Sequence, residues 1–262
     1  MSHLPSLRQI LTLLLWMIAP SAVFAQTKNS TVAPIELRCE SRTNPIGVDS
    51  SNPRLGWILK STARGASQTA YQILAASSLQ LLAKNRGDLW DSGKVNSEAF
   101  NEIAYAGKPL TSSQGVFWKV RVHDTAGTPS DWSAPAGWVM GALTPADWKD
   151  AKWIGAPSNS QPFDPKEAIK GPKEKYESVL LRRNLTIKPS LTRAVLHVTG
   201  LAQYELSLNG GKVGDALLTP GWTAYDKTVL YDTYDITRSL RPGANALGLF
   251  LGNGFYNTHN GR

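Results

Sequence analysis

The sequence predicts an all-β protein built from two sandwich-like halves with a linker between them. Two observations carry this prediction. Short apolar runs alternate with polar residues at a period of two, which turns one face of a strand inward and the other towards solvent. Glycine and proline, 22 and 16 of the 262 residues, separate these runs and provide turns. An apolar share of 42% with 18% charged residues argues against a disordered chain.

The first half, residues 34–142, has the clearest strand patterns. Its longest alternating run places four apolar residues on one face: Val116, Trp118, Val120 and Val122. A second run alternates around Trp57, so Trp57 and Trp118 are expected to face each other across the core. A short helix is expected at Leu79–Lys84, capped by Ser78. About seven short strands in this half fit an immunoglobulin or fibronectin type III sandwich.

Residues 143–175 are expected to form a linker. The stretch Ser158–Lys175 is rich in proline, serine, glycine and charged residues, a composition typical of exposed loops. Ahead of that stretch, Trp148, Trp153 and Ile154 provide the apolar residues that would anchor a strand.

Strand patterns resume in a second domain, residues 176–262. Five runs carry them: Ser178–Ile187, Arg193–Thr199, Gln203–Leu208, Thr228–Asp235 and Asn245–Leu251. Asn209-Gly210 lies between two of these runs and predicts a hairpin, because both residue types tolerate positive φ. No run after the last one supplies a neighbouring strand before Arg262, so this second sandwich is expected to be truncated.

Residues 1–25 predict a secretory signal peptide. Ile10–Ile18 is an apolar-dominated run, and Val23 and Ala25 provide small residues for cleavage before Gln26. The run is shorter than the about 20 residues that cross a bilayer, and no later segment approaches that length. A retained N-terminal anchor is the alternative. We expect an exported protein, periplasmic or extracellular, with no membrane span after cleavage.

Composition excludes several classes of partner and cofactor. The formal net charge of +8 is scattered along the chain, whereas nucleic-acid binding needs clustered cations, so no nucleic-acid partner is expected. A single cysteine, Cys39, excludes an intramolecular disulfide and a multi-cysteine zinc site. Four histidines without an HExxH pair make a metal site unexpected, and no other cofactor is predicted.

Two sets of carboxylates lie close enough in sequence to be considered as acid–base pairs. The first is Asp124 with Asp131, and the second is Asp226 with Asp232 and Asp235. We expect structural roles for them. Asp124 and Asp131 flank a Gly-Pro turn, where aspartate accepts hydrogen bonds from backbone N–H groups. Asp235 precedes a short helix start, where aspartate is a favoured N-cap.

An aromatic group offers a candidate sugar-binding surface. Aromatic rings cover the apolar C–H faces of sugars, and Trp222 and Tyr225 follow a Thr-Pro-Gly loop signal. Tyr231 and Tyr234 are separated by an odd offset, so a strand would place them on opposite faces, with at least one in the core. Two roles stay open for Trp222 and Tyr225: substrate binding, or packing against other parts of a larger protein.

Several motifs occur in series along residues 34–262. They are Gln68–Leu74, Gly87–Val95, Phe117–Asp124, Trp132-Ser133, Ala151–Gly155, Tyr234–Thr237, Gly243–Asn245 and Leu251–Gly254. In this order they resemble the N-terminal region of bacterial α-L-rhamnosidases, glycoside hydrolase family 78. The resemblance implies a fibronectin-like domain followed by the family's N-terminal β-sandwich, which is jelly-roll-like and incomplete in this sequence.

The resemblance also implies what the chain lacks. In that family these domains precede a further β-domain and an (α/α)₆ barrel that hydrolyses terminal α-L-rhamnosides with inversion. Inversion uses two carboxyl groups roughly 6.5–9.5 Å apart, and the family's pair belongs to the barrel. No position here matches the barrel motifs, so no catalytic residue is assigned.

The expected role is therefore a non-catalytic N-terminal portion that supports the missing catalytic domain. Rhamnose-containing glycans or glycosides would be the substrates of the full enzyme. The alternatives are a stand-alone carbohydrate-binding module and a structural adhesion domain, because a sandwich fold does not by itself fix a function.

Overall fold

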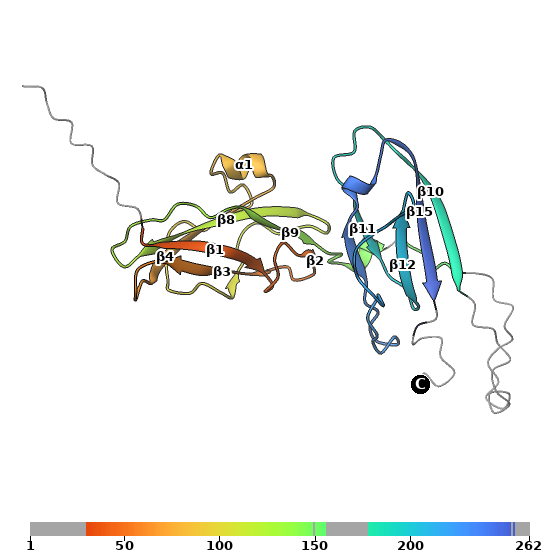
Figure 1. Ribbon diagram of the computed structural model, residues 1–262, viewed down its shortest axis with the longest axis horizontal. Coiled ribbons are helices and arrows are strands. Elements are labelled where there is room, and N and C mark those ends of the chain that lie inside the picture. Colours follow the sequence, from red (N-terminus) through yellow and green to blue (C-terminus); the bar gives the residue numbers. More distant parts are fainter. Residues whose placement is uncertain (1–29, 149, 156–177, 253, 255–262) are drawn as a thin grey trace, which may run out of the picture.

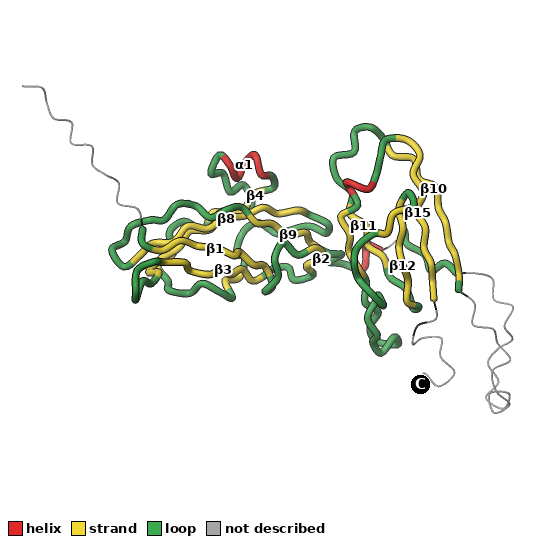
Figure 2. The backbone as a smooth tube through the Cα atoms, in the orientation of Figure 1, coloured by secondary structure: helices red, strands yellow, loops and turns green. Residues whose placement is uncertain are grey.

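The computed structural model describes residues 30–148, 150–155, 178–252 and 254. Figure 1 shows two β-rich domains, with strands running across the view in the first and up and down in the second. Within this described part, helical structure is limited to α1 (Leu79–Ala83) and two 3₁₀ turns, Pro145–Trp148 and Thr237–Ser239, drawn red in Figure 2. The all-β prediction is confirmed.

The first domain is a sandwich of two sheets. One sheet has the order β1-β3-β7, with strands Val32–Cys39, Arg54–Ser61 and Ile103–Ala104. The other has the order β2-β9-β8-β4-β5, with β6 also paired to β4. Its strands are Ile46–Val48, Ala136–Met140, Gly115–Asp124, Gln68–Ala76, Trp90–Asp91 and Val95–Asn96. The predicted immunoglobulin-like architecture is present.

The core of this sandwich follows the predicted alternation. All four inward residues of β8 are at most 1% exposed: Val116, Trp118, Val120 and Val122. Trp57 comes from the opposite sheet, is 3% exposed, and packs edge-on against Tyr71 with ring centroids 5.3 Å apart. Trp57 and Trp118 therefore belong to one core that is built from both sheets.

The other face of β8 departs from simple exposure. Lys119 is buried, although the alternation turns it away from the core. Its Nζ donates a hydrogen bond to Asn85 Oδ1 at 2.6 Å and lies 5.0 Å from the centroid of the Trp132 ring. The helix α1 covers this face, because its residue Leu82 packs against Leu74 and Ala76 of β4. Ser78 caps the helix, as predicted. Lys119 is therefore buried by tertiary contacts with α1 and Trp132, which a period-two pattern in the sequence cannot predict.

The second domain contains a four-stranded and a two-stranded sheet. The larger has the antiparallel order β10-β15-β12-β13, with strands Val179–Ile187, Gly243–Gly252, Gln203–Leu208 and Gly211–Lys212. The smaller pairs β11 (Val195–Val198) with β14 (Asp232–Asp235). The predicted hairpin at Asn209-Gly210 is confirmed, since these residues have φ of 53° and 85° and join β12 to β13.

Two predicted elements differ in the structure. The run predicted as Thr228–Asp235 becomes strand only from Asp232, because Thr228 turns back and donates its N–H to the carbonyl of Ala224 at 2.9 Å. The strand expected at Trp148, Trp153 and Ile154 is wrong. Trp148 ends a 3₁₀ turn, and residues 151–155 form no regular element.

The two domains contact each other where β2 meets β14. Gly47, in β2, has φ of +84°, and a Cβ built on it would lie 2.9 Å from Thr233 Oγ1 in β14. Only a residue without a side chain permits this approach. No local pattern in either half predicts that the two sandwiches meet at these strands.

Candidate functional site

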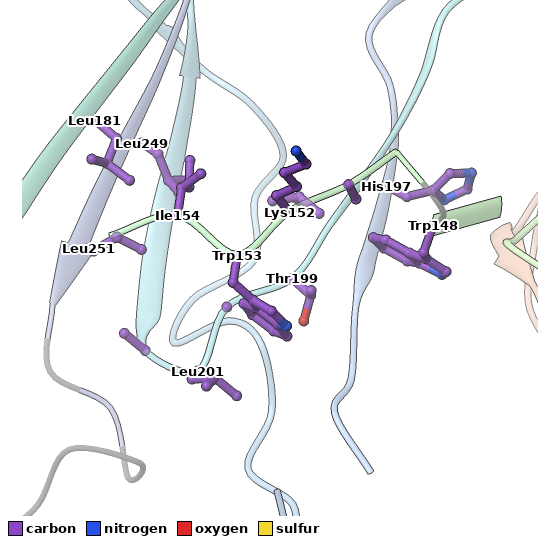
Figure 3. A pocket seen from close by; sticks show the side chains of 14 residues that line it. Trp148, Lys152, Trp153, Ile154, Leu181, His197, Thr199, Leu201, Leu249 and Leu251 are labelled. Carbon is purple, nitrogen blue, oxygen red and sulfur yellow. The ribbon is translucent and has the colours of Figure 1, made fainter. Parts of the chain in front are cut away.

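A partly open apolar groove of about 660 Å³ lies in the second domain. One wall is the sheet formed by β10 and β15, another is the segment 151–154 that was predicted as part of a linker, and residues 197–202 complete the lining. Figure 3 shows Ile154 directed towards Leu249 and Leu181, and Trp153 beside Leu201. We call this hollow the linker groove.

The strand register explains why the groove is apolar. Leu181 in β10 pairs with Leu249 in β15, and Val179 pairs with Leu251, so these side chains share one face of the sheet. On β12 the same face is buried at Leu206. Towards β10 the face is only partly covered, since Leu181 is only partly buried. Trp153 and Ile154, which lie over it, are themselves 66% and 71% exposed.

The linker groove has the chemistry of a packing or binding surface. Its ionisable lining groups are Lys152 and His197, and no carboxylate lies among its described lining residues. Glycoside hydrolysis by inversion needs one carboxyl group as acid and a second as base. Apolar walls of this kind bury a complementary apolar surface and cannot supply that pair.

The first candidate carboxylate is structural, as predicted. Asp124 accepts hydrogen bonds from the backbone N–H groups of Ala126 at 2.9 Å, Thr128 at 3.0 Å and Thr31 at 3.2 Å. Burial raises the pKa of Asp124, but these backbone hydrogen bonds outweigh burial and hold the pKa below its ordinary value. Asp124 therefore fixes the turn after β8. Its predicted companion Asp131 lies on the surface.

The second set of carboxylates is also dispersed. Asp232 accepts hydrogen bonds from the hydroxyl groups of Tyr204 at 2.5 Å and Thr219 at 2.6 Å. Asp235 accepts one from the backbone N–H of Thr237 at 3.0 Å. The predicted N-cap is wrong by one residue, because Ile236 is the N-cap of the 3₁₀ turn and Asp235 precedes it. Asp226 lies exposed in the preceding loop. Each aspartate thus belongs to a different local structure.

The aromatic candidates do not form one surface. Trp222 is 68% exposed and Tyr225 is partly buried, both in the loop between β13 and β14. Tyr231 lies at the boundary between the domains, whereas Tyr234 packs against Gly214. The odd offset does place Tyr231 and Tyr234 on different sides. Neither ring is fully buried, so the expectation of a core tyrosine is not met.

Sequence reasoning missed a polar cluster at the domain boundary. The imidazole of His197 lies 2.7 Å from Ser113 Oγ of the first domain and 2.9 Å from Thr233 Oγ1 of the second. The Trp148 and Tyr231 rings flank it, with centroids 6.2 Å and 5.7 Å from the imidazole. These residues are far apart in sequence and belong to no motif, so no pattern signals them. We call this cluster the interdomain joint.

Two other kinds of functional feature are absent from the described residues. No group of three or more His, Cys, Asp or Glu side chains is placed to hold a metal ion in the part of the chain that the structure describes. Likewise, no helix within residues 30–148, 150–155, 178–252 and 254 has the length and apolarity needed to cross a membrane.

Comparison with protein-family models identifies both domains. Residues 34–144 match the Rha78A-like, N-terminal immunoglobulin domain, and residues 189–262 match the alpha-L-rhamnosidase N-terminal domain. An alpha-L-rhamnosidase of Formosa agariphila is 38% identical over 224 residues, which are 82% of this chain and 24% of the relative. One from an Alteromonas species is 35% identical over 219 residues, covering 83% and 23%.

Solved structures agree with these matches. An alpha-L-rhamnosidase from Dictyoglumus thermophilum has a TM-score of 0.72 and 36% identity over 85% of this chain and 25% of its own. One from Aspergillus terreus has the same TM-score at 24% identity, covering 86% and 24%, which supports the fold alone. The chain spans about a quarter of the length of the curated relatives it matches. Its two domains are therefore those of the N-terminal region of alpha-L-rhamnosidases, an immunoglobulin-like domain followed by the N-terminal domain of the family.

Proposed function

We propose that this chain is the non-catalytic N-terminal portion of an exported α-L-rhamnosidase and that it supports an (α/α)₆ catalytic barrel outside the chain. In the full-length enzyme, terminal α-L-rhamnosides would be hydrolysed with inversion. The observation that carries the proposal is the succession of two rhamnosidase N-terminal domains in a chain covering about a quarter of its relatives.

The distribution of carboxylates supports a role without catalysis. Inverting hydrolysis requires two carboxyl groups roughly 6.5–9.5 Å apart around a bound sugar. The candidate carboxylates of the described residues instead serve backbone turns or hydroxyl groups, as Asp124 and Asp232 do. The open linker groove supports a scaffolding role, because burying its apolar lining against another domain would stabilise the contact between the two.

A turnover assay tests this proposal. The purified chain is incubated with an aryl α-L-rhamnoside, and the full-length Dictyoglumus thermophilum enzyme serves as the positive control. We expect no release of the aryl group by the chain alone. Multiple-turnover hydrolysis that co-elutes with the purified chain in size-exclusion chromatography would overturn the proposal.

A second candidate function is carbohydrate binding at Trp222 and Tyr225. It is favoured by the 68% exposure of Trp222 on a loop, which leaves ring surface for the C–H face of a sugar. Calorimetric titration with L-rhamnose should then show saturable binding that W222A abolishes and Y225A weakens. F100A is the matched control, since Phe100 is a 45% exposed aromatic residue of the first domain. The absence of binding would leave scaffolding, or a purely adhesive role, as the function.

Export is part of the same proposal. Residues 1–25 have the composition of a secretory signal, and they lie outside the residues that the structure describes. Expression in a bacterial host followed by intact-mass measurement of the exported protein should give a chain that begins near Gln26. A full-length chain retained in the membrane fraction would contradict this assignment.

A further inference from the structure

The interdomain joint has an unusual central residue. His197, in β11 of the second domain, uses both ring nitrogens: Nε2 bonds to Ser113 Oγ at 2.7 Å, and Nδ1 to Thr233 Oγ1 at 2.9 Å. Ser113 precedes β8 of the first domain and Thr233 lies in β14 of the second. Since a hydroxyl group both donates and accepts, either neutral tautomer satisfies this bridge. One imidazole therefore ties the two domains together.

Aromatic rings shield the imidazole from water. Trp148 and Tyr231 pack edge-on at 5.2 Å and both flank His197, which is partly buried. Tyr231 is itself held to the first domain, because its hydroxyl oxygen accepts a hydrogen bond from the N–H of Ala142 at 2.9 Å. Separation of the domains would therefore expose more of the imidazole to water.

Charged groups face the joint from each neighbouring element. Asp147 lies in the 3₁₀ turn beside Trp148 and favours a positive imidazole. Arg193, ahead of β11, donates a hydrogen bond to the Ser113 carbonyl at 3.4 Å and lies 3.7 Å from Asp235. Lys152 lines the linker groove together with His197. Burial raises the pKa of Tyr231 and of Tyr204. The negative charge of Asp49, beyond β2, adds to this effect on Tyr231, and that of Asp232, in β14, adds to it on Tyr204.

We propose that the interdomain joint is a pH-sensitive latch, in which neutral His197 fixes the orientation of the two domains and protonated His197 releases it. The inference does not depend on the proposed enzymatic context. It rests on a bridge that both domains share and on the burial of a titratable ring inside that bridge.

The direction of the pH effect follows from burial. Burial lowers the pKa of His197 from its ordinary value of 6.5, and attraction by Asp147 offsets only part of this effect. When the domains separate, the hydrated imidazole titrates near that ordinary value. The contribution of neutral His197 to docking is therefore fully present above pH 6.5 and is lost as the pH falls through the lowered pKa.

Other groups of the joint keep their charge state in this range. Hydrogen bonds from Ser112 and Thr144 hold the pKa of Asp147 below its ordinary value of 3.8. The pKa of Asp235 is also lowered, because its hydrogen bonds with Thr237 and the nearby Arg193 outweigh burial. Burial raises the pKa of Tyr231 above 10. Between pH 7.5 and 5.0 these two carboxylates stay ionised and this phenol stays neutral, which leaves His197 as the titrating group among them.

Distance measurement between the domains tests the latch. Spin labels are attached through T62C in the first domain and D215C in the second, both at exposed loop positions. Cys39 stays unlabelled because it is buried and burial raises the pKa of its thiol to about 12. Pulsed electron paramagnetic resonance should give a narrow distance distribution at pH 7.5 that broadens towards pH 5.0, with a midpoint below 6.5.

Variants separate the latch from general acid effects. H197Q, which keeps hydrogen-bonding groups but does not titrate in this range, should give a distribution that does not change between pH 7.5 and 5.0. H123Q is the matched control, because His123 is buried in β8 and should leave the wild-type response intact. S113A removes the first-domain partner and should broaden the distribution already at pH 7.5.

Three results would overturn the proposal. The first is a wild-type distribution that is the same at pH 7.5 and 5.0. The second is a pH response that persists in H197Q at its wild-type size. The third is an S113A distribution as narrow as that of the wild type at pH 7.5. The S113A measurement needs no change at His197, so it decides the matter even if H197Q does not fold.

Discussion

The hydroxyl oxygen of Tyr231 accepts a hydrogen bond from the backbone N–H of Ala142 at 2.9 Å, across 89 positions of sequence. Ala142 follows β9 of the first domain, and Tyr231 precedes β14 of the second. Gly47 and Thr233 approach each other at the same boundary. Because strands from both domains meet there, substitutions at the boundary are expected to change the stability of both domains.

The first prediction concerns Gly47. G47A puts a methyl group 2.9 Å from Thr233 Oγ1, at a φ of +84° that disfavours any side chain. G65A is the matched control, since Gly65 has φ of +71° with nothing within 4 Å. Both should lose about 1 kcal/mol from the backbone conformation. G47A should lose a further ~1–3 kcal/mol from crowding, measured by urea unfolding. Equal losses would show that the domains do not pack at Gly47.

The second prediction compares two buried tryptophans of the first domain. Trp57 Nε1 donates a hydrogen bond to Gln68 Oε1 at 3.0 Å, whereas Trp118 Nε1 has no hydrogen-bond partner among the described residues. Both substitutions to phenylalanine lose packing volume. W57F also leaves the buried Gln68 oxygen without that donor, which costs about 1–3 kcal/mol, while W118F removes an unsatisfied donor.

Urea unfolding at pH 7 therefore should rank W57F as less stable than W118F. A free energy of unfolding that is lower for W118F than for W57F would contradict this reading of the core. The m-values of both variants should match the wild type, because neither change alters the surface exposed on unfolding to a large extent.

The strands and core of the first domain could be predicted from sequence because alternation depends on local pattern. The β8 run from Val116 to Val122 follows from it. The hairpin at Asn209-Gly210 in the second domain follows from another local signal, the tolerance of both residue types for positive φ. Trp148 could not be placed in the same way. Its 3₁₀ turn depends on Asp147 accepting a hydrogen bond from the N–H of Thr144, and its ring is positioned by the second domain.

The candidate site was less predictable than the fold. At the interdomain joint, His197 has its hydrogen-bond partner Ser113 84 positions away. The fold has a comparable case in Lys119, which is covered by a helix and by Trp132. Such contacts depend on tertiary arrangement, which periodicity does not encode. Trp222 and Tyr225 could be identified as loop residues, but their role in sugar binding stays a prediction.

The third prediction concerns acid stability and Asp124. Its backbone hydrogen bonds outweigh burial and hold its pKa below the ordinary value of 3.8. A carboxylate with a lowered pKa contributes stability that is present above 3.8 and is lost as the pH falls through the lowered value. D124N should be less stable than the wild type at pH 7 and should lose less stability on acidification.

The control for this prediction is D131N. Asp131 lies on the surface of the same turn region, and its neutralisation should leave the pH profile of unfolding close to that of the wild type. Urea unfolding is measured for the three proteins between pH 7 and 3. Identical pH profiles for D124N and the wild type would show that the turn after β8 does not depend on this carboxylate.

The last prediction concerns the linker groove. The groove has an apolar lining and a volume of about 660 Å³, which is large enough to take up an aromatic dye such as anilinonaphthalene sulfonate. Leu181 lines the groove, so L181S should reduce the dye fluorescence by roughly half or more, because it places a hydroxyl group in the apolar wall. L217S is the matched control, since Leu217 is 81% exposed and lies outside the groove.

If both variants reduce the fluorescence equally, the dye reports scattered surface leucines, and the groove is not a binding surface in solution. If L181S alone reduces it, the groove is open in the isolated chain and available to an apolar surface of another domain.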